Sequence, residues 1–242
     1  MAPRASSFGA MSRTLAAVAI LFAILAAPAR AGGPSVLVEL YTSQGCSACP
    51  PADRLLAELA EREGVVALSL HVDYWDYLGW RDSFAQKRFT KRQYAYRDRM
   101  GLRMVYTPQM IVHGSAELQG TQPERVAALI AAARREGAGA RVSIAPHEGM
   151  LVARLEPAGG KGGVVWVAGY HDRGEVSIES GENAGRDFTY RNVVHSLTRL
   201  GHWDGTAPRE IELPAPAPGG GVALWVQGED LGPVRAVARY EP

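Results

Sequence analysis

Two apolar runs with a helical pattern between them open the part of the chain that is expected to fold. Residues 36–41 and 64–73 are nearly continuous in hydrophobic side chains and rich in β-branched ones, which predicts two buried strands. Residues 52–59 place apolar side chains at helical spacing. A strand, a helix and a strand in this order predict a parallel pair with a right-handed crossover.

The next segments predict a helix, a hairpin and another helix. Asp82 and Ser83 can cap a helix over about residues 84–99, whose many basic side chains are typical of a solvated face. Thr107-Pro108 precedes a short β-rich run, and residues 117–120 would form its hairpin partner. Pro108 lacks a backbone donor, so it fits the start of a strand. Residues 121–135 carry the signals of a helix that opens on a proline.

The C-terminal third has a different rhythm. Short β-like runs separated by glycine and proline clusters occupy residues 142–144, 150–155, 163–170, 221–227 and 235–240. Their alternation and spacing predict a mostly antiparallel, sandwich-like domain. We therefore expect a first domain over residues 32–138 and a second over residues 139–242.

The first 31 residues have the pattern of a secretory signal. Arg4 and Arg13 precede an apolar run over residues 15–27, and Ala29 and Ala31 are the small residues that a signal peptidase recognises. We expect no stable membrane span after cleavage and a periplasmic or secreted location. The net charge of +1 gives no support for nucleic-acid binding.

Cys46 and Cys49 are the only cysteines in the chain. A disulfide between them closes a very short loop and stabilises the fold little through chain entropy. A structural zinc site usually needs four ligands, and no second cysteine pair exists. Redox chemistry is the favoured interpretation, and a stray pair or a metal site completed by histidine are the alternatives. Cys46 precedes a predicted helix, whose N-terminal dipole favours a thiolate.

The order of these elements resembles the thioredoxin fold. That resemblance implies an α/β thioredoxin-like domain with a helical insertion, followed by the β-rich domain. It also implies that Cys46 is the nucleophile, that Cys49 is the resolving thiol and that Pro108 is a cis proline facing them. Thr107 would offer its backbone to a bound partner, and Glu39 would be the buried acid on the first strand.

A closer resemblance is to a secreted family known as domain of unknown function 1223. It rests on the run LYTSQGCSACPPAD at residues 40–53, on VDYWD at 72–76, on VYTPQM at 105–110, on GEN at 181–183 and on NVV at 192–194. This resemblance implies export and the same fold over nearly the whole mature chain, without an established reaction.

Three functions follow from these observations. The first is an exported thiol–disulfide oxidoreductase that needs no cofactor and has protein thiols or disulfides as transient partners. The second is a copper-binding module, because soft thiolates select copper(I) and His71, Met104 or Met110 could add a ligand. The third is a non-enzymatic interaction module with an inert disulfide. His171, Asp172, His195 and His202 fall at no recognised metal-ligand spacing, so we predict no metal there. The oligomeric state is left open.

Overall fold

The computed structural model describes residues 34–242 except 138 and 160–161. The predicted signal segment, residues 1–31, lies outside the described residues. The described residues form one compact unit. Within the described part of the chain, no helix has the length and apolar character needed to cross a membrane.

The described chain is built mostly of strands, with three α-helices in its first half. The helices are α1 (Pro50–Ala60), α2 (Lys87–Met100) and α3 (Pro123–Glu136), and short 3-10 turns occupy Asp76–Leu78 and Glu229–Leu231. The strands are β1 (Val36–Thr42), β2 (Val65–His71), β3 (Gln109–Val112), β4 (Ala116–Gln119), β5 (Ala140–His147), β6 (Met150–Pro157), β7 (Gly163–Ile178), β8 (Arg186–Trp203), β9 (Arg209–Leu213), β10 (Gly220–Gln227) and β11 (Val234–Tyr240).

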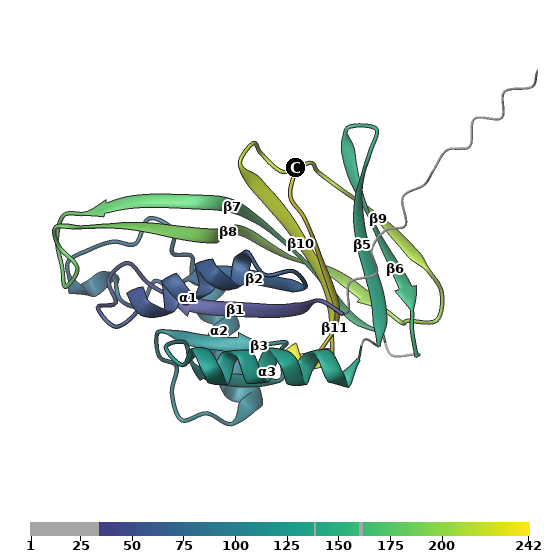
Figure 1. The fold of residues 1–242 in the computed structure, drawn as a ribbon, viewed down its shortest axis with the longest axis horizontal. Helices are drawn as coiled ribbons and strands as arrows, with labels where there is room; N and C mark the ends of the chain where they lie inside the picture. Colours follow the sequence, from purple (N-terminus) through teal and green to yellow (C-terminus); the bar gives the residue numbers. More distant parts are fainter. Residues whose placement is uncertain (1–33, 138, 160–161) are drawn as a thin grey trace, which may run out of the picture. The chain divides into compact units, whose positions relative to one another are not determined.

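Eight strands form one mixed sheet in the order β11-β10-β7-β8-β2-β1-β3-β4, and a small sheet has the order β5-β6-β9. β1 and β2 are parallel, as the strand-helix-strand order predicts, with Val36 opposite Val65. β8 runs parallel to β2 where Ser69 meets Val193, and it is antiparallel to β7. Figure 1 shows β7 and β8 as a long hairpin that passes α1 and β2 and continues toward β10.

The predicted fold class, an α/β thioredoxin-like domain followed by a sandwich-like β domain, is wrong. The structure is a mostly β fold, and strands from both halves of the chain belong to the same large sheet. Asn192 on β8 stabilises the pairing of β8 with β2, because its Nδ2 donates a 2.9 Å hydrogen bond to the carbonyl oxygen of Ala67 on β2. Hydrophobic runs predict where strands lie, but they do not tell which strands pair. The hydrophobic pattern therefore does not predict that strands after residue 138 join the same sheet as β1 and β2.

The faces of β1 point into two different cores. Val38 and Leu40 pack with α1 and α3 on one face of the sheet. Leu37 and Tyr41 pack on the other face with α2 and with residues of β8, β10 and β11. Because successive side chains of a strand alternate between faces, Thr42 shares the α1 side with Leu40. Glu39 belongs to the opposite side.

Candidate functional site

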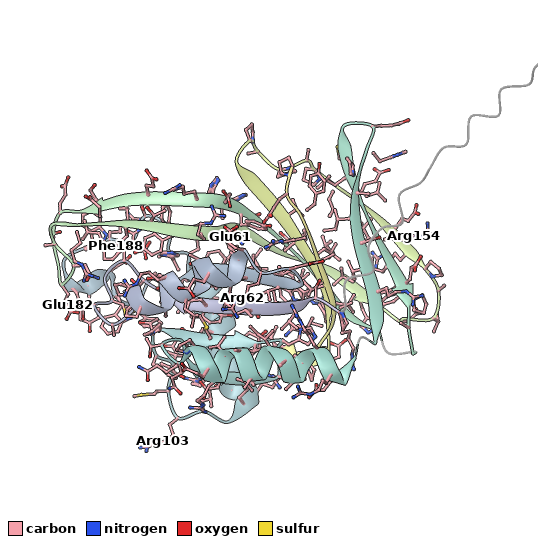
Figure 2. The ribbon with its side chains drawn as sticks, viewed as in Figure 1. Glu61, Arg62, Arg103, Arg154, Glu182 and Phe188 are labelled. Carbon is pink, nitrogen blue, oxygen red and sulfur yellow. A yellow bond between two sulfur atoms is a disulfide. The ribbon has the colours of Figure 1, made fainter. Side chains whose placement is uncertain are left out.

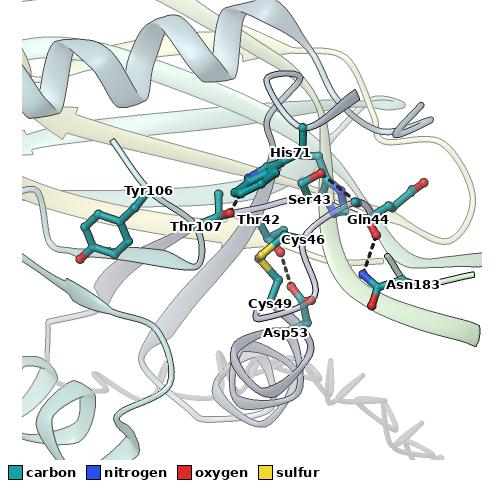
Figure 3. Close-up of a disulfide and its surroundings, with 12 residues drawn as sticks. Thr42, Ser43, Gln44, Cys46, Cys49, Asp53, His71, Tyr106, Thr107 and Asn183 are labelled. Carbon is teal, nitrogen blue, oxygen red and sulfur yellow. Dashed lines mark hydrogen bonds between the residues drawn. A yellow bond between two sulfur atoms is a disulfide. The ribbon is translucent and has the colours of Figure 1, made fainter. Parts of the chain in front are cut away.

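Cys46 and Cys49 form a disulfide, and their Cα atoms are 5.4 Å apart. Both side chains are buried, with 3% and 0% exposed, whereas Ser47 and Ala48 between them are exposed. The disulfide lies at the start of α1, as the close-up in Figure 3 shows. An exposed two-residue turn therefore lies between the two buried cysteines.

The N-terminus of α1 differs from the sequence prediction in one respect. Cys49, rather than Cys46, borders the helix as its N-cap residue, and the next two residues are prolines. The N–H groups of Ala52 and Asp53 both donate to the carbonyl oxygen of Cys49, at 2.9 and 3.1 Å. Proline has no N–H, so the first turn of α1 supplies the positive end of the helix dipole but no free amide donor to Cys46.

Thr107 and Pro108 precede β3, and Trp75 links Thr107 to the loop before the cysteines. The peptide bond between Thr107 and Pro108 is cis, and β3 begins at the following residue. The indole N–H of Trp75 donates a 2.7 Å hydrogen bond to Thr107 Oγ1. Trp75 also packs on Gly45, where an added Cβ would lie 3.3 Å from the Cβ of Trp75. Figure 3 draws Thr107 among the surroundings of the disulfide, and Trp75 links it to Gly45, which precedes Cys46.

Glu39 is the exception among the predicted site residues. Its carboxylate accepts hydrogen bonds from Arg92 at 2.7 and 3.3 Å and from the hydroxyl of Tyr96 at 2.6 Å. Arg92 also donates to Gln227 at 2.9 Å, and its guanidinium lies over the ring of Trp166. This buried ion pair joins β1 to α2 and β10, on the side of β1 that faces away from α1. The structure therefore does not bring Glu39 to the disulfide.

A different buried acid, Asp53, lies on α1 one turn after Cys49. Its Oδ1 accepts a 2.8 Å hydrogen bond from Thr42 Oγ1 at the end of β1. Burial raises the pKa of Asp53 to about 7, although His71 and the bond from Thr42 act in the opposite direction. Asp53 is not among the site residues predicted from the sequence. The available signal was an acid four residues after the second cysteine, flanked by Ala52 and Leu56 of the apolar helix face.

His71 and Asp82 form a second buried polar pair on the same side. His71 Nδ1 lies 2.7 Å from Asp82 Oδ2, and both side chains are fully buried. The backbone N–H groups of Gln44 and Phe84 also donate to Asp82, each at 2.8 Å. Burial raises the pKa of Asp82, but His71 and these hydrogen bonds outweigh it and hold the pKa below its ordinary value.

The prediction that Asp82 caps a helix starting near residue 84 is thus wrong. α2 begins at Lys87 with Gln86 as its N-cap residue. Asp82 instead supports the loop before the cysteines, through the amide of Gln44. The sequence did carry one signal for this buried pair: His71 is a polar residue at the end of a strand that is otherwise apolar.

The turn that joins β7 to β8 reaches the cysteine loop. Asn183 is buried there, and its Nδ2 donates a 2.9 Å hydrogen bond to the carbonyl oxygen of Gln44 (Figure 3). Trp80 donates from its indole to the side chain of Gln44 at 2.9 Å, and Ser180 donates to the Gly79 carbonyl at 2.6 Å. Figure 2 labels Glu182 at the tip of this hairpin. The second half of the chain therefore helps to hold the loop that leads to Cys46.

The candidate metal ligands are spread over several places. The rings of His171 and His195 lie 4.6 Å apart, whereas Asp172 pairs with Arg191 and His202 lies 3.3 Å from Glu229. Of the residues proposed as copper ligands, Met104 is 67% exposed and Met110 is buried in the core beside α1. Among the described residues, no group of three or more His, Cys, Asp or Glu side chains has the arrangement of a metal site.

Fold and site together define a mostly β protein with a buried Cys-X-X-Cys disulfide at the start of a helix. The chain belongs to the family described as "Protein of unknown function (DUF1223)", whose model matches residues 37–227. An X-ray structure of protein AGR_C_4864 from Agrobacterium tumefaciens is similar at 34% identity, with a TM-score of 0.75 over 86% of this chain and 94% of that one.

A second similar structure, HBP35 of Porphyromonas gingivalis, has 13% identity and a TM-score of 0.57 over 86% of this chain and 75% of that one. At this identity the likeness concerns the fold alone. No curated protein matches the chain.

Proposed function

We propose that this protein is exported to the periplasm or secreted, and that it exchanges thiols and disulfides with partner proteins through Cys46 and Cys49. The observation that carries this proposal is the position of the disulfide. It joins two buried cysteines across the exposed turn Ser47-Ala48, with Thr107 among its surroundings. The bond joins residues only 3 positions apart, so it contributes little to stability through chain entropy, and a purely structural role has little support.

The proposed exchange has two steps. In the reduced protein, the Cys46 thiolate attacks one sulfur of a partner disulfide, forms a mixed disulfide and releases one partner thiolate. Cys49 then attacks Cys46 Sγ, which restores the internal disulfide and releases the second partner thiolate. Two electrons pass from the protein dithiol to the partner, and the reverse sequence reduces the protein. Cys46 is assigned the first role because it lies in the loop before the helix, whereas Cys49 is fully buried and is the N-cap residue of α1.

The test is the reduction potential of the cysteine couple, measured by equilibration with glutathione. A value of about −120 to −270 mV is expected, because known exchangers fall in this range. In parallel, Cys49→Ser should trap partner proteins through Cys46, and Cys46→Ser should trap none. A potential below about −300 mV, or an absence of mixed disulfides with Cys49→Ser, would mark the pair as an inert bond.

A further inference from the structure

Asp53 lies one helical turn after Cys49. Asp53 follows the N-cap residue Cys49 by four positions, and its N–H donates to the Cys49 carbonyl oxygen at 3.1 Å. Side chains at this spacing lie on the same helix face, with their Cβ atoms about 5–6 Å apart. Figure 3 shows the Asp53 side chain on the same side of the helix as the disulfide.

One of the two carboxyl oxygens of Asp53 is available to bind a proton. Oδ1 is bound by Thr42, but Oδ2 is buried and has no hydrogen-bond partner within the described chain. A buried carboxylate without full hydrogen bonding is costly, so it retains a proton more readily than an exposed one does. Buried polar groups are normally paired, and an unpaired oxygen at this place is consistent with a proton carrier.

His71 faces the same space from β2. Thr42 and His71 are opposite each other in the parallel pair β1–β2, so both side chains lie on the α1 side of the sheet. Asp82 takes the Nδ1 side of the imidazole at 2.7 Å, whereas Nε2 is buried and has no partner within the described chain. The ring is also held by Phe84 and Tyr190, whose centroids lie 5.3 and 4.7 Å away.

The titratable and charged groups around Asp53 come from four elements. They are His71 on β2, Asp82 in the loop before α2, Tyr190 on β8 and Arg54 on α1. Burial is the largest influence on the Asp53 pKa and raises it. His71 and Arg54 lower it, and Asp82 raises it. The acid therefore has a pKa of about 7, at which it can both accept and return a proton near neutral pH.

We infer that Asp53 is the proton acceptor for Cys49, and that the buried His71–Asp82 pair is a positioning pair that sets the charge facing Asp53. This inference rests on the proposed thiol–disulfide exchange. When the mixed disulfide at Cys46 resolves, the Cys49 thiol gives its proton to the Asp53 carboxylate, and the sulfur attacks Cys46 Sγ. In the reverse direction, protonated Asp53 returns the proton to the Cys49 thiolate as the internal disulfide breaks.

The experiment follows the two steps separately. Reduced full-length protein is mixed with oxidised glutathione between pH 5 and 9, quenched with acid and analysed by mass spectrometry. Reduced protein, the glutathione mixed disulfide and the internal disulfide then differ in mass. For Asp53→Asn we expect the second step to slow at least tenfold at pH 7, so that the mixed disulfide accumulates. The first step should stay within about threefold of the wild type.

The pH profile separates proton transfer from a structural effect. In the wild type, the second step should level off above about pH 7, where Asp53 is ionised. In Asp53→Asn it should continue to rise about tenfold per pH unit with the thiolate fraction of Cys49. His71→Gln should move the midpoint of the wild-type profile upward, because His71 lowers the pKa of Asp53. If His71→Gln does not fold, Thr42→Val should move the midpoint in the same direction.

The controls and the possible outcomes distinguish the proposed thiol–disulfide exchange from the proton-transfer role of Asp53. Glu58→Gln removes an exposed carboxylate from the same helix and should leave both steps unchanged. Asparagine resembles the protonated form of Asp53, so Asp53→Asn is expected to fold. If Cys49→Ser, in which the mixed disulfide at Cys46 cannot resolve, forms no mixed disulfide with glutathione, the proposed function itself is wrong. If the mixed disulfide forms and Asp53→Asn resolves it at the wild-type rate and pH profile, or slows both steps equally, only the proton-transfer role is overturned.

Discussion

Thr42 Oγ1 donates a 2.8 Å hydrogen bond to Oδ1 of Asp53, and this bond joins the end of β1 to the first turn of α1. Both side chains are buried. The bond lies one helical turn from Cys49, so a change in the ionisation of Asp53 acts on the junction that holds the disulfide. Stability and redox chemistry are therefore expected to be coupled at this place.

The first prediction concerns this hydrogen bond. Thr42→Val should lower the free energy of unfolding by about 1–3 kcal/mol at pH 8, because the buried carboxylate loses a donor. The loss should be smaller at pH 5, where Asp53 is protonated. Urea unfolding of the oxidised protein at both pH values measures the difference, and Thr189→Val on the exposed side of β8 is the control. An equal loss at both pH values would contradict the prediction.

The second prediction concerns the ionisation of Asp53 in the oxidised protein. Folded Asp53 keeps its proton up to about pH 7, and the ordinary pKa is 3.8. The folded state thus binds more protons between these values, so the free energy of unfolding should fall as pH rises through this window. Asp53→Asn should remove this fall. The unfolding free energy of the variant, relative to that of the wild type, should therefore be about 2–4 kcal/mol more favourable at pH 8 than at pH 4. Urea unfolding of the wild type and the variant at several pH values would measure this difference. If the unfolding free energies of the two proteins changed with pH in parallel, the prediction would be refuted.

The third prediction concerns His113, which has the opposite pH dependence. Its buried Nδ1 accepts a 3.2 Å hydrogen bond from the Leu37 N–H, and burial lowers the pKa of His113 to about 4. The unfolded state binds more protons between pH 6.5 and 4, so stability should decline as pH falls through that range, by about 3 kcal/mol at most.

The variant for this test is His113→Asn. His113 has a positive φ of 53°, a conformation that asparagine tolerates well. The variant should lose the decline in stability at acid pH, measured by thermal unfolding at pH 4, 5 and 6.5. His147→Asn, at an exposed position of β5, should keep it. A decline of the same size in both variants would exclude His113 as its source.

The fourth prediction separates stability from redox chemistry at Glu39. Arg92→Met leaves the Glu39 carboxylate buried without its cation, and it should cost about 3–5 kcal/mol of unfolding free energy. The double variant Glu39→Gln/Arg92→Met should recover much of that loss. Arg173→Met, which breaks a pair exposed by 60% and 67%, should cost about 0.5 kcal/mol or less.

The single variant Glu39→Gln tests whether Glu39 takes part in the redox chemistry. Because its carboxylate faces α2 and lies on the other side of β1 from α1, Glu39→Gln should leave the reduction potential and both exchange steps unchanged. A tenfold slower exchange with intact folding would return Glu39 to the redox site.

Much of the local structure could be predicted from the residues. The β-branched runs of β1 and β2 and the helical spacing of α1 gave the right elements, because hydrophobic periodicity within a segment reports the face that it buries. The cysteine pair at the start of a helix also agrees with the structure, as does the cis bond before Pro108, which only the thioredoxin resemblance implied. These features depend on residues a few positions apart.

The partners across the sheet were decided only by tertiary structure. β8 binds to β2 through contacts such as Asn192 with Ala67, 125 positions apart in sequence, and this pairing gives a mostly β fold in place of the predicted α/β thioredoxin-like one. The same packing placed Glu39 against Arg92 and gathered Asp53, His71 and Asp82 behind the disulfide. Strand alternation sorts side chains into two faces, but only the folded chain determines which elements cover each face. Buried polar groups then acquire their partners, and their pKa values, from those elements.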